Sequence, residues 1–84
     1  MKKLSRELLV KTILEKRKEK EISQQKLSEL TGINRSILSR LESNDYMPSI
    51  EQLEKLGEVL DFEVVSLFVE EKKEIKKEKT SPYL

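Results

Sequence analysis

The clearest hydrophobic pattern lies in residues 24–43, where apolar side chains recur at helical spacing on both sides of a glycine. Leucines three residues apart share one face of a helix, so the two such pairs here predict two short amphipathic helices. The positions expected to form one buried seam between these helices are Leu27, Leu30, Ile33, Leu38 and Leu41. Gly32 can adopt the positive φ that ends a helix sharply. A short joint containing glycine sets two helices at roughly 90–120°, so this segment predicts a helix-turn-helix.

Capping residues mark where the predicted helices begin. Serine and asparagine side chains accept a hydrogen bond from the unpaired backbone N–H groups of a first helical turn. The residues placed to do so are Ser5, Ser23, Asn34 and Ser49. Ser49 and Gln52 together match a capping box, which predicts the start of a fourth helix. Its apolar stripe, expected to pack on the seam, is Ile50, Leu53, Leu56, Val59 and Leu60, and Gly57 permits close packing.

Residues 62–69 are more apolar than one helical face can bury. Six of these eight residues are Val, Leu or Phe. We expect a short fifth helix opened by Asp61 or Glu63, although Val and Phe also favour a β-strand that would pair across a dimer. Surplus apolar surface on a small protein usually has a partner, so we predict a homodimer through this region. The residues expected at its interface are Phe62, Val65, Phe68 and Val69. The alternative is that all six apolar residues belong to the intramolecular core.

Length and composition limit the fold and the chemistry. With 84 residues the chain holds one domain with a small core, and we expect an all-α, five-helix bundle. We assign residues 1–69 to this domain and residues 70–84 to a charged tail that is a frayed helix or disordered. The sequence has no Cys and no His, which excludes disulfides, thiolate metal sites and most catalytic constellations, although not carboxylate chemistry. We expect no metal, no cofactor and no enzymatic activity. No membrane span or signal-peptide core is found, and we expect a cytoplasmic protein.

Charge is unevenly distributed along the chain. Residues 1–44 carry 11 basic and 6 acidic side chains, a net charge of +5, whereas residues 45–71 carry 1 basic and 8 acidic, a net charge of −7. Such polarity fits a domain whose N-terminal half faces a polyanion while its acidic half faces away. The simpler alternative is that the charges only keep a small bundle in solution.

The second helix of the predicted helix-turn-helix has a polar face that the seam does not use. Its residues are Asn34, Arg35, Ser36, Ser39 and Arg40. Asn can pair with adenine and Arg with guanine through two hydrogen bonds each, and Ser can donate to a base or a phosphate. Such a face suits a helix that enters the major groove of DNA. Its alternative role is that of an ordinary solvated helix surface.

Residues 13–68 resemble the Cro and lambda-repressor-like (XRE) family of bacterial and phage DNA-binding domains. The resemblance rests on Arg17, on Ile22-Ser23-Gln24, on Gly32-Ile33, on the run RSILSRLE from Arg35 to Glu42, and on Pro48-Ser49. It implies a lambda-repressor-like bundle. It also implies that Gln24 contacts a DNA phosphate, and that Asn34, Arg35, Ser36 and Arg40 read bases or hold the backbone. Arg17 and Glu42 match a pair that usually forms a partly buried salt bridge.

The sequence departs from the family pattern at three positions. Ser28 occupies the place of a tightly packed Ala, and we expect its hydroxyl to bond the carbonyl four residues back. Asn44 replaces a Gly, and Asn tolerates the left-handed conformation. Asp45 replaces a basic residue and would repel phosphate, which leaves Tyr46 as a neutral DNA contact in its place.

Two functions remain open from the sequence. The first is a sequence-specific DNA-binding regulator, most simply a repressor, that binds an operator in double-stranded DNA as a homodimer. The second is a protein-interaction module of the same fold, such as an antitoxin, that uses residues 62–69 to bind a partner protein. Arg35, Arg40 and Gln24 favour the first, while Asp45 and the near-neutral net charge favour the second.

Overall fold

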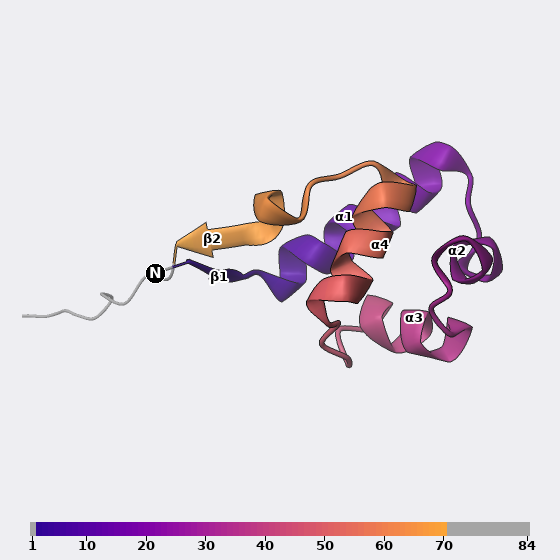
Figure 1. Cartoon of the computed structure of the whole chain (residues 1–84), viewed down its shortest axis with the longest axis horizontal. Coiled ribbons are helices and arrows are strands. Elements are labelled where there is room, and N and C mark those ends of the chain that lie inside the picture. The colour runs from indigo at the N-terminus through magenta and orange to yellow at the C-terminus, as the bar shows by residue number, and fades with distance from the viewer. Residues whose placement is uncertain (1, 71–84) are drawn as a thin grey trace, which may run out of the picture.

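The computed structural model describes residues 2–70, which form a helical body with a small two-stranded sheet at one end (Figure 1). In chain order the elements are β1 (Lys2–Leu4), α1 (Arg6–Lys20), α2 (Gln24–Thr31), α3 (Arg35–Glu42), α4 (Ile50–Leu60), the 3₁₀ turn η1 (Val64–Leu67) and β2 (Phe68–Glu70). The predicted charged tail, except for Glu70, lies outside the described residues. Within residues 2–70, no helix is both long enough and apolar enough to cross a bilayer.

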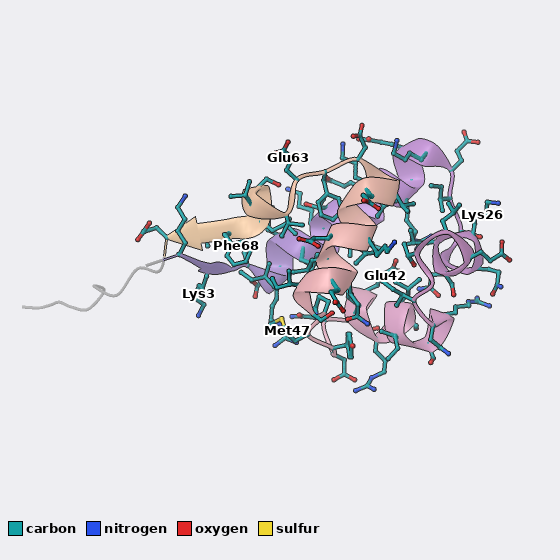
Figure 2. All side chains as sticks on the ribbon, viewed as in Figure 1. Lys3, Lys26, Glu42, Met47, Glu63 and Phe68 are labelled. Carbon is teal, nitrogen blue, oxygen red and sulfur yellow. The ribbon has the colours of Figure 1, made fainter. Side chains whose placement is uncertain are left out.

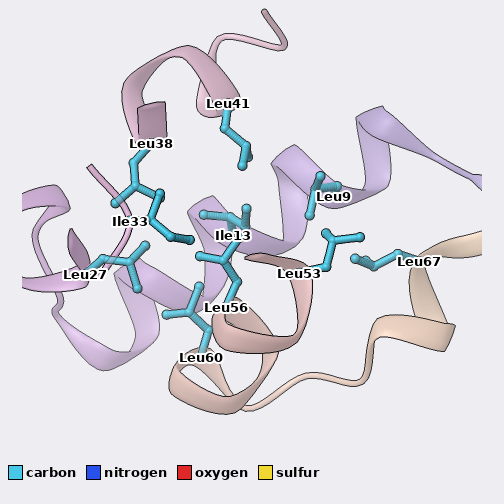
Figure 3. Packing of buried hydrophobic residues seen from close by; sticks show 10 residues of the cluster. All are labelled: Leu9, Ile13, Leu27, Ile33, Leu38, Leu41, Leu53, Leu56, Leu60 and Leu67. Atoms are coloured by element: carbon cyan, nitrogen blue, oxygen red, sulfur yellow. The ribbon is translucent and has the colours of Figure 1, made fainter. Parts of the chain in front are cut away.

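The core lies where the four helices meet (Figure 3). Ten aliphatic side chains are buried in it: Leu9, Ile13, Leu27, Ile33, Leu38, Leu41, Leu53, Leu56, Leu60 and Leu67. Four of the five seam positions predicted from the sequence are among them. The prediction for the fifth, Leu30, is wrong, because this side chain is 48% exposed. Thr31 is buried instead, since its hydroxyl donates to the carbonyl of Leu27 and its polar group is thereby satisfied.

The helix boundaries follow the predicted caps. The side chains of Ser5, Ser23, Asn34 and Ser49 each accept a backbone hydrogen bond in the first turn of the helix that follows. The capping box of Ser49 and Gln52 is formed in both directions. At the other end of α4, Asp61 has a φ of 66° and ends the helix rather than opening a new one. Ile50 was expected in the core, but it is the first residue of α4 and is 57% exposed.

The expectation of a fifth α-helix and an all-α fold is wrong. Between α4 and residue 70 the structure has one 3₁₀ turn and then β2, which pairs antiparallel with β1, with Leu4 opposite Phe68 and Lys3 opposite Val69. The backbone N–H of Ser5 also donates to the carbonyl of Leu67 at 2.9 Å. The strand alternative is therefore correct for the last residues of the segment, but its partner is the N-terminal strand of the same chain. Local periodicity cannot show a partner more than sixty residues away.

The apolar segment 62–69 is divided between the core and the surface. Leu67 is buried, and Phe62 and Val64 pack against the core. Phe62 lies close to Gly57, where an added Cβ would meet the carbonyl oxygen of Phe62 at 2.6 Å. Val65 and Val69, by contrast, are 65% and 42% exposed. The surplus apolar surface thus consists of two valines rather than the whole segment.

Candidate nucleic-acid interface

The polar residues singled out in α3 lie together on one outer face. A shallow groove between the start of α2 and the outer side of α3 is lined by Gln24, Arg35, Ser36, Ser39 and Arg40. All of these residues except the half-buried Gln24 are exposed. The opposite side of α3 carries Leu38 and Leu41 into the core. This helix is therefore fixed by its apolar side and presents serines and arginines to solvent at the edge of the molecule (Figure 1).

The turn between α2 and α3 is held by two side chains of α2, Ser28 and Thr31, which bond the backbone of Ile33. Gly32 has a φ of 78°, and its N–H donates to the carbonyl of Ser28 at 2.8 Å. The hydroxyl of Ser28 donates forward to the carbonyl of Ile33 at 2.6 Å, so the expectation that it bonds four residues back is wrong. The left-handed Gly32 reverses the chain and brings that carbonyl within reach of the Ser28 hydroxyl. The Thr31 hydroxyl accepts from the N–H of Ile33 at 3.1 Å.

Asn34 immediately precedes α3, and its side chain caps the first turn of that helix. Its Oδ1 accepts from the N–H of Ser36 at 2.8 Å and from the Ser36 hydroxyl at 2.6 Å. Both lone pairs of that oxygen are thus occupied. To pair with adenine through both amide atoms, Asn34 would need Ser36 to release Oδ1. With this cap intact, Asn34 has only its amide N–H groups left to offer a DNA partner.

Glu42, whose side chain is labelled in Figure 2, links the last turn of α3 to α1 and α2 through hydrogen bonds. Arg17 donates to its two carboxylate oxygens, from Nε at 2.8 Å and from Nη2 at 3.0 Å. Gln24 donates from Nε2 to the same carboxylate at 2.8 Å. The third guanidinium nitrogen of Arg17 donates to the carbonyl of Ile22 at 2.9 Å. The structure therefore brings Arg17 and Glu42 together, and it ties the Gln24 amide to them at the edge of the groove.

The loop after α3 folds back onto Arg40. The N–H of Asp45 donates to the carbonyl of Arg40 at 2.7 Å, and Asn44 supplies the left-handed residue that turns the chain, with a φ of 61°. Arg40 Nε lies 3.7 Å from Asp45 Oδ2. Sequence reasoning treated Asp45 only as a group that repels phosphate and missed this pairing. The signal that was present is the Asn at residue 44, because a left-handed residue there reverses the chain toward α3.

Tyr46 was expected to contact DNA, but its hydroxyl is already engaged. The hydroxyl donates to Gln52 Oε1 at 3.0 Å, and the half-buried ring packs on the core. The ring centroid lies 5.9 Å from the guanidinium carbon of Arg40. Tyr46 therefore supports the base of the loop and the flank of Arg40.

A second groove, on the other side of the turn, has the opposite charge. It runs between Gly32 and α4, and three exposed glutamates line it: Glu51, Glu54 and Glu58. Carboxylates there disfavour a phosphate backbone, whereas the α3 groove carries two arginines. Charge therefore selects the α3 side for a polyanion. Among residues 2–70, no three His, Cys, Asp or Glu side chains are grouped as metal ligands.

Comparison with known protein families agrees with this geometry. A family model described as helix-turn-helix matches residues 13–67, which include all four α-helices except the start of α1. No curated protein and no solved structure matches the chain.

Proposed function

The chain belongs to the helix-turn-helix family, as a Cro and lambda-repressor-like DNA-binding domain, and from this premise we propose that it represses transcription by binding an operator as a homodimer. In this proposal α3 lies in the major groove and Gln24 holds a phosphate beside it. Arg35, Ser36, Ser39 and Arg40 contact base edges or the adjacent backbone. Occupation of a promoter by the dimer then excludes the transcription machinery.

The observation that carries the proposal is the single groove that joins Gln24 to the exposed side of α3. Arginine and serine side chains there are donors of the kinds that read guanine and grip phosphate. The apolar side of the same helix packs in the core, and the contact of Glu42 with Arg17 fixes its last turn. A rigid helix with exposed arginine and serine side chains on one side suits base reading, because little order has to be created on binding.

The homodimer rests on a separate observation, the exposed pair Val65 and Val69 near the sheet. One α3 reads only a few base pairs, and domains of this type bind two half-sites about 34 Å apart. A twofold partner would cover both valines and present a second α3 to the next turn of the groove. Phe62 and Phe68, the other two residues expected at the interface, are half-buried.

The test is selection of bound fragments from random duplex DNA, at a stated salt concentration. We expect enrichment of a sequence with twofold symmetry. Arg40→Ala should then weaken binding to that sequence by about 1–3 kcal/mol and lose discrimination at one base position. Lys55→Ala, on the acidic groove, removes a cation of the same charge and should leave the discrimination unchanged. Failure of the wild-type protein to enrich any sequence would refute the proposal.

A further inference from the structure

Arg40 is contacted on several sides by the loop that follows α3. Its Nε lies 3.7 Å from the Asp45 carboxylate, its Nη2 donates to the Asp45 carbonyl at 3.4 Å, and its guanidinium lies 5.9 Å from the centre of the Tyr46 ring. The carboxylate and the carbonyl both face the Nε–Nη2 edge of the guanidinium. The other edge, formed by Nη1 and the second N–H of Nη2, has the two parallel donors that guanine needs.

We propose that Asp45 is a positioning residue that holds Arg40 toward a base edge and away from phosphate, and so determines sequence specificity. The inference rests on the proposed function, because it concerns the same groove. In this proposal Asp45 itself does not contact DNA. Its role is to restrict which partner Arg40 can reach.

The physical reason lies in the competition between phosphates and bases for an arginine. A long, unrestrained arginine beside DNA pairs readily with phosphate, and this contact has no sequence information. A carboxylate beside the guanidinium repels phosphate and offsets its charge, which weakens the phosphate contact that Arg40 could otherwise make on any DNA sequence. It also orders the side chain before binding, so less conformational entropy is lost when a base is met. Binding to random DNA therefore falls while binding to the correct base is retained.

The pair is too exposed to serve mainly as a stabilising contact. The side chains of Arg40 and Asp45 are 58% and 75% exposed, and ion pairs at that exposure contribute little to folding. Removal of the carboxylate should therefore leave the thermal unfolding of the protein unchanged. Any effect on DNA binding can then be measured in a folded protein.

The experiment compares Asp45→Asn with Asp61→Asn in the full chain. Both variants change the net charge by +1, and Asp61 is an exposed residue that caps the end of α4 and does not line the α3 groove. Fluorescence anisotropy with the selected operator and with a random duplex, over a series of salt concentrations, gives both affinities. For Asp45→Asn we expect tighter binding to the random duplex and a salt slope steeper by about 0.9, which is one added phosphate contact. The ratio of operator to random affinity should fall about tenfold, or about 1.4 kcal/mol.

A second variant separates action through Arg40 from direct action on DNA. In an Arg40→Ala background, Asp45→Asn should leave the ratio unchanged, because no guanidinium remains to be positioned. A ratio that falls equally in both backgrounds would overturn the positioning role, as would an Asp45→Asn ratio no different from that of Asp61→Asn. A wild-type protein with no operator preference would instead refute the proposed function, and that result is read before any variant is made.

Discussion

Replacement of Glu42 by Ala should destabilise the fold far more than loss of an ordinary surface glutamate. Glu42 is only 8% exposed and accepts three hydrogen bonds, two from Arg17 and one from Gln24. The Ala variant leaves the Arg17 guanidinium without its counter-charge beside the core. Removal of one partner from a buried pair costs about 3–5 kcal/mol.

The expected magnitude is somewhat lower here. The Arg17 side chain is 20% exposed and keeps its bond to the Ile22 carbonyl, so water and backbone recover part of the loss. We therefore expect Glu42→Ala to lower the free energy of unfolding by about 2–3 kcal/mol. For a domain of this length that loss lowers Tm by roughly 10–20 °C. Denaturant titration and thermal circular dichroism measure both quantities.

Two further variants test the cause. Glu54→Ala makes the same replacement at an exposed position of α4 and should change stability by no more than about 0.5 kcal/mol. Addition of Arg17→Met to Glu42→Ala should cost little more or restore stability, because the unpaired charge is then gone. A loss below about 1 kcal/mol for Glu42→Ala, or simple additivity in the double variant, would refute a buried ion pair as the link between α1 and α3.

Three other changes test different parts of the structure. Gly57→Ala places a methyl group against the backbone of Phe62 and should cost about 1–3 kcal/mol, although Ala is the better helix former; an unchanged Tm would contradict that contact. Thr31→Val keeps the side-chain shape but removes the hydroxyl that joins α2 to the turn, and should cost about 1–3 kcal/mol by urea titration, whereas a neutral result would show that water satisfies the turn. Val65→Glu with Val69→Glu should give a folded monomer by sedimentation and circular dichroism, because both valines are exposed within one protomer; a dimer that persists would place the interface elsewhere.

The helix-turn-helix was predictable from the sequence because it depends on neighbours. Leu27, Leu38 and Leu41 lie at helical spacing, and Gly32 and Asn34 are residue types whose local chemistry ends one helix and begins the next. Such signals act over three or four residues, so they require no knowledge of the rest of the chain. The residues on the outer face of α3 could likewise be predicted once the residues on its buried face were known.

What the tertiary structure decided is which groups from distant parts of the chain meet. The strand at Phe68 forms because Leu4 lies opposite, and Leu30 stays exposed although its spacing from Leu27 is helical. The bond from Ser28 to the Ile33 carbonyl and the pairing of Asp45 with Arg40 depend on how the chain reverses after each helix. The spacing of hydrophobic residues indicates which side chains of a helix or strand face the core. It has no information about the partner that a strand, a hydroxyl or a carboxylate finds once the chain has folded, because that partner is set by the packing of the whole domain.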